Sequence, residues 1–168
     1  MLMLPRAVTT ITPQRLSFAG GGTDLPDFYQ QHGGAVISTT IDKYIYVTVK
    51  RHHPLFNEAY RLSYSKTEHV NSLDDIENDV ARECLRLVEV EPPLFIATAS
   101  DLPVSSGLGS SSSFAVGLLY ALHTMRGEDV SAGQLAEEAC HVEINVLQRP
   151  IGKQDQYAAA FGGLNYIT

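Results

Sequence analysis

The sequence lacks the features that define several large classes of protein. Its two cysteines, Cys84 and Cys140, stand far apart and outside any CxxC pair, which excludes a zinc finger and argues against a disulfide scaffold. No apolar run approaches the roughly 18 residues of a transmembrane helix. Residues 1–5 have no apolar segment behind a positive charge, as a signal peptide would. We therefore expect a cytoplasmic protein with reduced thiols and no membrane partner.

Positive charge is also scarce. The 12 lysines and arginines are outnumbered by 19 acidic residues, which gives a net charge of −7 and argues against a nucleic-acid partner. A small anionic ligand remains compatible with this charge, because backbone dipoles bind anions inside acidic proteins. The hydrophobic share of 44% over 168 residues predicts one globular domain with a real core rather than a disordered chain.

Apolar periodicity and turn residues predict a chain of mixed strands and helices. Strands are expected at 9–18, at 35–50 as one or two strands, at 60–64, at 94–99 and from 164 onward. Helices are expected at 24–32, 74–90, 110–126, 131–147 and 154–161. Ser131 and Gln134 form a capping box for the fourth helix, and Gly127 closes the third. Because the last strand is unfinished at Thr168, we expect a truncated chain.

A glycine- and serine-rich loop, residues 103–113, is the most informative motif. It joins a strand to an apolar helix. The glycines let the backbone approach a ligand closely, and the start of the helix carries the positive end of its dipole. Together these features predict a site for an anion such as phosphate. The loop lacks the Walker A pattern, and Ser112 stands where the dinucleotide fingerprint needs glycine. A flexible linker is the alternative, although a linker would not lead straight into an apolar helix.

Two carboxylates stand where a ligand site needs them. Glu143 falls on the apolar stripe of helix 131–147, four residues from both Ala139 and Leu147. A carboxylate that faces a core is costly unless it is paired or bound to a metal, so it predicts a Mg²⁺ ligand or a general base. The alternative is that Glu143 lies at the edge of the stripe and reaches water. Asp155 begins the next helix among small residues that leave room for a ligand, although the helix dipole alone would also favour an acid there.

The segment 15–24 combines one cation, Arg15, with three glycines, Thr23 and Asp24. A polar, glycine-rich turn between a strand and a helix is a plausible place to bind sugar hydroxyls. A tight turn explains the glycines equally well.

These motifs, taken together and in this order, resemble the GHMP kinase superfamily, and within it the D-glycero-D-manno-heptose 7-phosphate kinase-like sugar kinases. The resemblance rests on Pro13-Gln14-Arg15, the stretch 17–26 (SFAGGGTDLP), the loop 107–113, Glu143 and the stretch 151–157 (IGKQDQY). It implies an α+β fold in which helices pack on one side of a mixed sheet. Residues 1–168 would be the N-terminal, ATP-binding domain, without the C-terminal half. Gln14 departs from the superfamily, which has glycine at that position.

The resemblance also implies roles for individual residues, with ATP and Mg²⁺ as cofactors. The backbone of the loop would hold the ATP phosphates: Gly107, Leu108, Gly109, Ser110, Ser111 and Ser112. Ser111 and Glu143 would hold Mg²⁺, Asp155 would be the catalytic base, and Arg15 would steady the transferred phosphoryl group. The sugar would be bound by Gly21, Gly22, Thr23 and Asp24. Lys153 meeting a second phosphate of the substrate is our own hypothesis rather than a family role.

The implied function is ATP-dependent phosphorylation of a sugar or sugar phosphate. The first candidate substrate is D-glycero-D-manno-heptose 7-phosphate, phosphorylated at its anomeric hydroxyl. One alternative is a kinase of a neutral sugar, similar to fucokinase or galactokinase. The other is a non-catalytic half that binds nucleotide or a partner. The expected partners are the small-molecule substrate and either a second copy of the chain or the missing C-terminal half.

Overall fold

A computed structural model of the protein describes residues 4–53, 55–103 and 106–168. The strands are β1 (Ala7–Ala19), β2 (Val36–Arg51), β3 (Tyr60–Ser63), β4 (Thr67–Val70), β5 (Leu94–Ser100) and β6 (Leu164–Ile167). They form one sheet in the order β1-β2-β5-β3-β4, and β6 pairs with the start of β2. All neighbours are antiparallel except β3 and β5, so the sheet is mixed.

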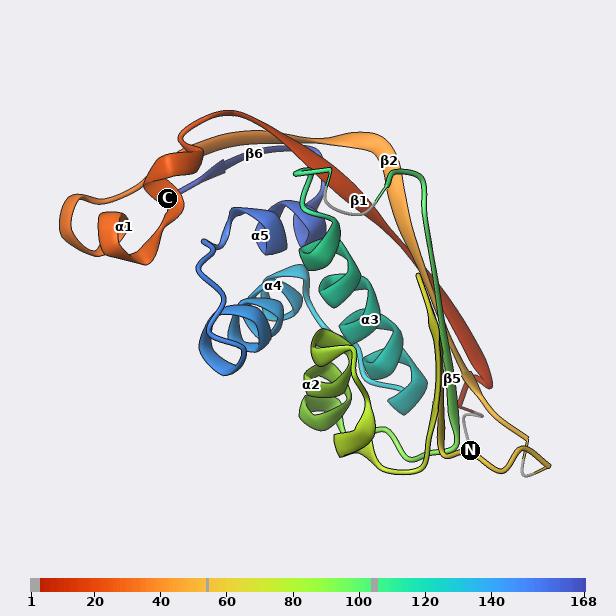
Figure 1. Ribbon diagram of the computed structural model, residues 1–168. Helices are drawn as coiled ribbons and strands as arrows, with labels where there is room; N and C mark the ends of the chain where they lie inside the picture. Colours follow the sequence, from red (N-terminus) through yellow and green to blue (C-terminus); the bar gives the residue numbers. More distant parts are fainter. Residues whose placement is uncertain (1–3, 54, 104–105) are drawn as a thin grey trace.

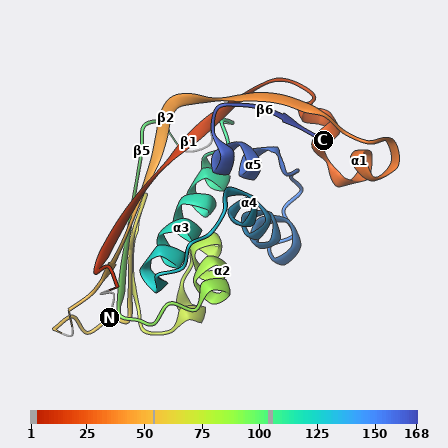
Figure 2. The same cartoon turned by 180° about the vertical axis from the view of Figure 1, so that it is seen from behind.

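The α-helices lie on one side of this sheet, except the first, which lies at one end of it (Figure 1). They are α1 (Pro26–His32), α2 (Asp79–Val88), α3 (Ser110–Arg126), α4 (Ala132–Cys140) and α5 (Gln154–Phe161), with 3-10 turns at Gly21–Asp24 and Leu73–Asp75 and a π-helix at His141–Val146. Seen from behind, no helix of the described residues lies on the opposite face of the sheet, and α1 and β6 lie together at one end (Figure 2). The predicted α+β fold, with a mixed sheet and helices on one side, is confirmed.

The core lies between β2 and α3. Ile45, Val47 and Val49 alternate along β2 and are buried, because successive side chains of a strand point to opposite faces. Each such side chain contributes roughly 1.5–3 kcal/mol when it is fully buried. At Gly117, helix α3 comes so close to β1 that a Cβ atom would lie 2.6 Å from Thr12 Oγ1, so a larger residue does not fit there.

Several predicted boundaries hold and several do not. Helices 110–126 and 154–161 are confirmed, and Gly127 ends α3 in the left-handed conformation. Helix α2 begins at Asp79 rather than at residue 74, because the Asn78 side chain accepts from the backbone N–H of Ala81. The short strand β4 was not predicted. No helix in the described residues has both the length and the apolar composition needed to cross a membrane.

The predicted helix 131–147 divides into α4 and the π-helix. Ser131 caps its start by accepting from the backbone N–H of Gln134, but the Gln134 side chain bonds to Glu138, so only half of the capping box forms. The wider π turn carries Glu143, and such turns are often found at functional sites.

Candidate active site

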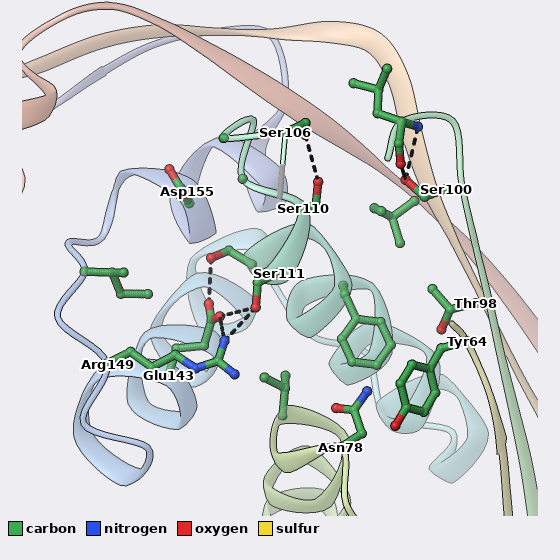
Figure 3. Close-up of a pocket in the computed structure, with 18 of the residues that line it drawn as sticks. Tyr64, Asn78, Thr98, Ser100, Ser106, Ser110, Ser111, Glu143, Arg149 and Asp155 are labelled. Atoms are coloured by element: carbon green, nitrogen blue, oxygen red, sulfur yellow. Dashed lines mark hydrogen bonds and ion pairs between the residues drawn. The ribbon is translucent and has the colours of Figure 1, made fainter. Parts of the chain in front are cut away.

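A cavity of about 850 Å³ opens at the N-terminal end of α3 (Figure 3). This volume is in the range of small-molecule sites. One end is polar and contains Arg15, Glu143 and Asp155, and the other end contains Tyr64 and Asn78. The first turn of α3 lies between these two ends in the close-up.

The glycine-serine loop forms the middle of the cavity wall. Gly107 and Gly109 have φ angles of 74° and 78°, a left-handed conformation that favours glycine. No side chain caps α3, whose first-turn N–H groups have no partner within the helix. Leu108 accepts at its carbonyl from the Arg15 backbone N–H at 3.1 Å, which pins the loop to β1. The loop therefore has the form of an anion cradle; its residues 104 and 105 lie outside the described part of the chain.

Asp155 and Arg15 form an ion pair beside this loop. Arg15 Nε and Nη2 each lie 2.6 Å from Asp155 Oδ1, and Arg15 Nη1 donates to the Gly107 carbonyl at 2.9 Å. A Cβ on Gly109 would lie 3.4 Å from the Asp155 carboxyl, so glycine keeps the loop close to the acid. Burial raises the pKa of Asp155 above its ordinary value, and the charge of Arg15 opposes this rise.

Replacing Arg15 with glutamine is expected to move the titration of Asp155 to higher pH, because the opposing positive charge is lost while the burial remains. A raised folded-state pKa means that the stability contributed by this carboxyl is fully present below its unfolded pKa and is lost as pH rises through the folded pKa. Carboxyl ¹³C NMR measures the midpoint. Arg86→Gln, on the surface of α2, is the matched control. A midpoint in Arg15→Gln at or below that of wild type would contradict the pairing.

Glu143 is fully buried and its carboxylate is surrounded by donors. Ser112 Oγ and Gln156 Nε2 donate to Oε2 at 2.6 and 2.7 Å. Ser111 Oγ and Arg149 Nη1 donate to Oε1 at 2.8 and 3.0 Å. Glu143 therefore faces the core as a paired carboxylate, and the alternative in which it reaches water is wrong.

Two oxygen atoms at Glu143 are suitable ligands for a magnesium ion. Ser111 Oγ and Glu143 Oε1 are hard oxygen ligands at the mouth of the anion cradle, and Mg²⁺ in proteins is usually held by one or two carboxylates together with substrate phosphates. In the described residues, no three His, Cys, Asp or Glu side chains gather to hold a metal by themselves. A cation here would thus depend on ligands from a bound phosphate.

The predicted sugar-binding residues lie at the start of α5. Both oxygens of the buried Asp24 accept backbone N–H groups, those of Lys153 and Gln154, at 3.0 Å each. Thr23 Oγ1 bonds to the backbone of Gly20 and Ala35. Both side chains thus hold the turn 20–24 and the start of α5, directly before Asp155.

A second cavity, of about 270 Å³, lies beside this turn and is lined by Thr23, Asp24 and Lys153. Lys153 Nζ lies 5.9 Å from the ring centroid of Tyr29. A Cβ on Gly22 would have no atom within 4 Å, and a Cβ on Gly21 would lie 3.6 Å from the Gln154 side chain. The predicted residues are therefore close together, and Lys153 provides a cation.

At the far end of the large cavity, Glu68 fixes the residues of the wall by hydrogen bonds. No sequence motif indicated a role for this residue. Its carboxylate accepts from the Tyr64 hydroxyl at 2.6 Å and from the backbone N–H groups of Glu77 and Asn78 at 2.6 and 3.2 Å. Burial and this bond raise the pKa of Tyr64 to about 12. The Tyr64 ring and the backbone of Asn78 are thereby fixed at the cavity wall.

Sequence reasoning gave no role to three side chains that build the site, Gln14, Arg149 and Gln156. Gln14 is fully buried and donates to Ser110 Oγ at 3.1 Å, which braces the first residue of α3. Gln156 and Arg149 hold Glu143. The replacement of glycine by Gln14 was a signal that this position carries a special contact; the other two side chains acquire their roles only through folding.

Comparisons with known proteins identify the family of the chain. The family model described as the GHMP kinases N terminal domain matches residues 76–163, more than half of the chain. The D-glycero-alpha-D-manno-heptose 7-phosphate kinase of Campylobacter jejuni is 33% identical over 96% of this chain and 50% of its own length. The galactokinase of Thermotoga maritima is 26% identical over 89% of this chain and 42% of its own length.

A solved structure, that of a D-glycero-D-manno-heptose 1-phosphate kinase from Bacteroides thetaiotaomicron, superposes with a TM-score of 0.82 at 30% identity. The match covers 94% of this chain and 55% of that one. The chain thus spans about half the length of the relatives it matches. The extent of the family-model match, with the shared fold, shows that the chain belongs to the GHMP kinases and carries their N-terminal domain.

Proposed function

We propose that the protein is an ATP-dependent sugar kinase that phosphorylates D-glycero-D-manno-heptose 7-phosphate at its anomeric hydroxyl, with residues 1–168 forming its ATP-binding N-terminal domain. The observation that carries this proposal is the ion pair of Asp155 and Arg15 directly against an anion cradle. A base beside a phosphate site is what transfer of a phosphoryl group to a hydroxyl requires. The relatives named as heptose phosphate kinases support the choice of sugar.

In this proposal, ATP lies along the large cavity. Its base would lie at the end that holds Tyr64 and Asn78, and its phosphates against the N–H groups of residues 107–112. Ser111 and Glu143 would hold Mg²⁺, which neutralises charge on the phosphate oxygens. The uncapped start of α3 adds its dipole to the same charge.

Asp155 would accept the proton of the sugar hydroxyl as that oxygen attacks the γ-phosphorus, with ADP as the leaving group. Arg15 contacts both the acid and the loop, so its guanidinium would stabilise charge on the transferred group. Asp24 uses two of the roughly four acceptor positions of a carboxylate for backbone N–H groups, which leaves the others for sugar hydroxyls. Gly21 and Gly22 would let the sugar approach the backbone, and Thr23 would keep the turn in place.

The distal phosphate of the substrate would lie in the second cavity, near the Lys153 ammonium. An interaction of this kind is worth about 1.5–3 kcal/mol, or roughly tenfold or more in affinity. Lys153→Ala is therefore expected to raise KM for heptose 7-phosphate at least about tenfold. Lys43→Ala, at a partly exposed position in β2, is the charge-matched control and should leave KM unchanged. An unchanged KM in Lys153→Ala would remove Lys153 from the substrate site.

The proposed activity is tested by ADP release from Mg-ATP with a panel of acceptors: heptose 7-phosphate, mannose 6-phosphate, galactose, fucose and mevalonate. Turnover with heptose 7-phosphate is the expected result. Turnover with a neutral sugar alone would make the protein a galactokinase- or fucokinase-like enzyme. No turnover with any acceptor, together with measurable ATP binding, would favour the non-catalytic alternative.

A further inference from the structure

We propose that the Arg149 guanidinium is the counter-ion of Glu143 while no nucleotide is bound. It then occupies the position of the metal ion and competes with free divalent cations for that position. The inference rests on the proposed function and adds a means by which the same site is regulated. Arg149 is then a positioning residue: it keeps free metal out and lets the cation enter with the nucleotide phosphates.

The contacts of Arg149 coincide with those assigned to the cation (Figure 3). Its Nη1 lies 2.7 Å from Ser111 Oγ and 3.0 Å from Glu143 Oε1, the two oxygens that would hold Mg²⁺. The other oxygen of Glu143 already accepts from Ser112 and Gln156. A guanidinium and a metal ion cannot share the same two oxygens, so one has to leave before the other binds.

Electrostatics explains why a cation is present at all. Glu143 is 0% exposed, and a buried carboxylate is unfavourable without a partner of opposite charge. Arg149 supplies that partner, and no other cation in the described residues forms an ion pair with Glu143. Removal of the guanidinium therefore leaves a buried negative charge that a small divalent cation can satisfy.

Arg149 also pairs with a second carboxylate, that of Asp79. Its Nη2 lies 2.9 Å from Asp79 Oδ1, at the first residue of α2 and on the cavity wall. The backbone around Arg149 is held: Gln148 has a φ of 52°, and the Arg149 N–H donates to the Glu143 carbonyl at 3.0 Å. In this proposal the side chain would turn from Glu143 toward Asp79 when the nucleotide binds, while the backbone stays in place.

The test measures binding of Mn²⁺, a paramagnetic substitute for Mg²⁺, by electron paramagnetic resonance without nucleotide. Arg149→Gln is expected to bind Mn²⁺ at least about tenfold more tightly than wild type, and the double variant Arg149→Gln, Glu143→Gln should lose this gain. Arg149→Lys retains a cation and should stay within about threefold of wild type. Arg86→Gln removes an arginine of α2 that pairs with Glu83 of the same helix and with Asp74 of the preceding 3-10 turn, and it should leave Mn²⁺ binding unchanged.

Equal or weaker Mn²⁺ binding by a folded Arg149→Gln chain would overturn the proposal. If Arg149→Gln does not fold alone, Mn²⁺ has to restore its cooperative unfolding transition, because binding energy at such a site becomes folding energy. A variant unfolded both with and without Mn²⁺ would also overturn it. Calorimetry of Mg-ATP binding to the wild type tests the proposed function separately, since the Mn²⁺ measurement uses no nucleotide.

Discussion

Asp155→Asn is expected to lower the rate of sugar phosphorylation by about 10²–10⁴-fold, the usual contribution of a general base. Asparagine has the shape of the acid but cannot accept the proton of the attacking hydroxyl. The raised pKa of Asp155 matters here, because a carboxylate of higher pKa is a stronger base. Steady-state ADP release at saturating heptose 7-phosphate measures the effect.

Mg-ATP binding provides the control for this variant. The proposed nucleotide contacts lie in the loop and at Ser111, so calorimetric ATP affinity should stay within a few-fold of wild type. Arg15 donates to the Gly107 carbonyl as well as to Asp155, so the variant should keep this bond and the loop in place. A rate within tenfold of wild type would show that Asp155 is not the base. A large loss of ATP affinity would instead point to a structural role for the ion pair.

Gly152→Ala is expected to destabilise the protein by about 3–5 kcal/mol. A Cβ at this position would lie 2.0 Å from the Asp24 carbonyl oxygen and 2.1 Å from Asp24 Oδ2, and one of those atoms belongs to the backbone. Overpacking of this kind costs roughly 1–3 kcal/mol. The displaced carboxylate would also lose its bonds to Lys153 and Gln154, and a bond to a charged group is worth about 1.5–3 kcal/mol.

Urea unfolding followed by circular dichroism measures this loss. Gly133→Ala in α4 is the matched control: its Cβ would have only ordinary contacts, at 3.8 Å or more, and alanine favours a helix by about 0.5–1 kcal/mol. The control should therefore be unchanged or slightly more stable. If Gly152→Ala unfolds within about 1 kcal/mol of wild type, the contact between Asp24 and the start of α5 is not essential to the fold. Because this contact precedes Asp155, we also expect the variant to lose activity.

Some elements were predictable because their caps, breakers and apolar pattern lie within or next to them in the sequence. Helices α3 and α5 begin and end where predicted, because each has a breaker or cap on both sides and an apolar face between. Strand β5 is a short apolar run between Pro93 and the loop, and it also formed as expected. The anion cradle belongs to the same group, since glycine at positive φ followed by a helix start is a local arrangement.

Other elements depended on neighbours far away in the chain. Strand β4 carries the polar residues Glu68 and His69 and has no strong strand pattern; it forms because β3 offers an edge for pairing. The start of α2 depends on Asn78, whose backbone is held by Glu68. The change from α4 to a π-helix at His141 has no counterpart in the apolar spacing, which continues as in an α-helix.

For the site, the sequence alone predicted the candidate functional residues: the loop, a carboxylate on an apolar stripe, and an acid at a helix start. Their pairing became visible only in the folded chain. Arg15 meets Asp155 across 140 positions, Asp24 holds the start of α5 across 130, and Arg149 joins Glu143 to Asp79. Charge pairing acts through space, whereas periodicity and capping act over a few residues, so these partners become defined only when the sheet and helices pack together.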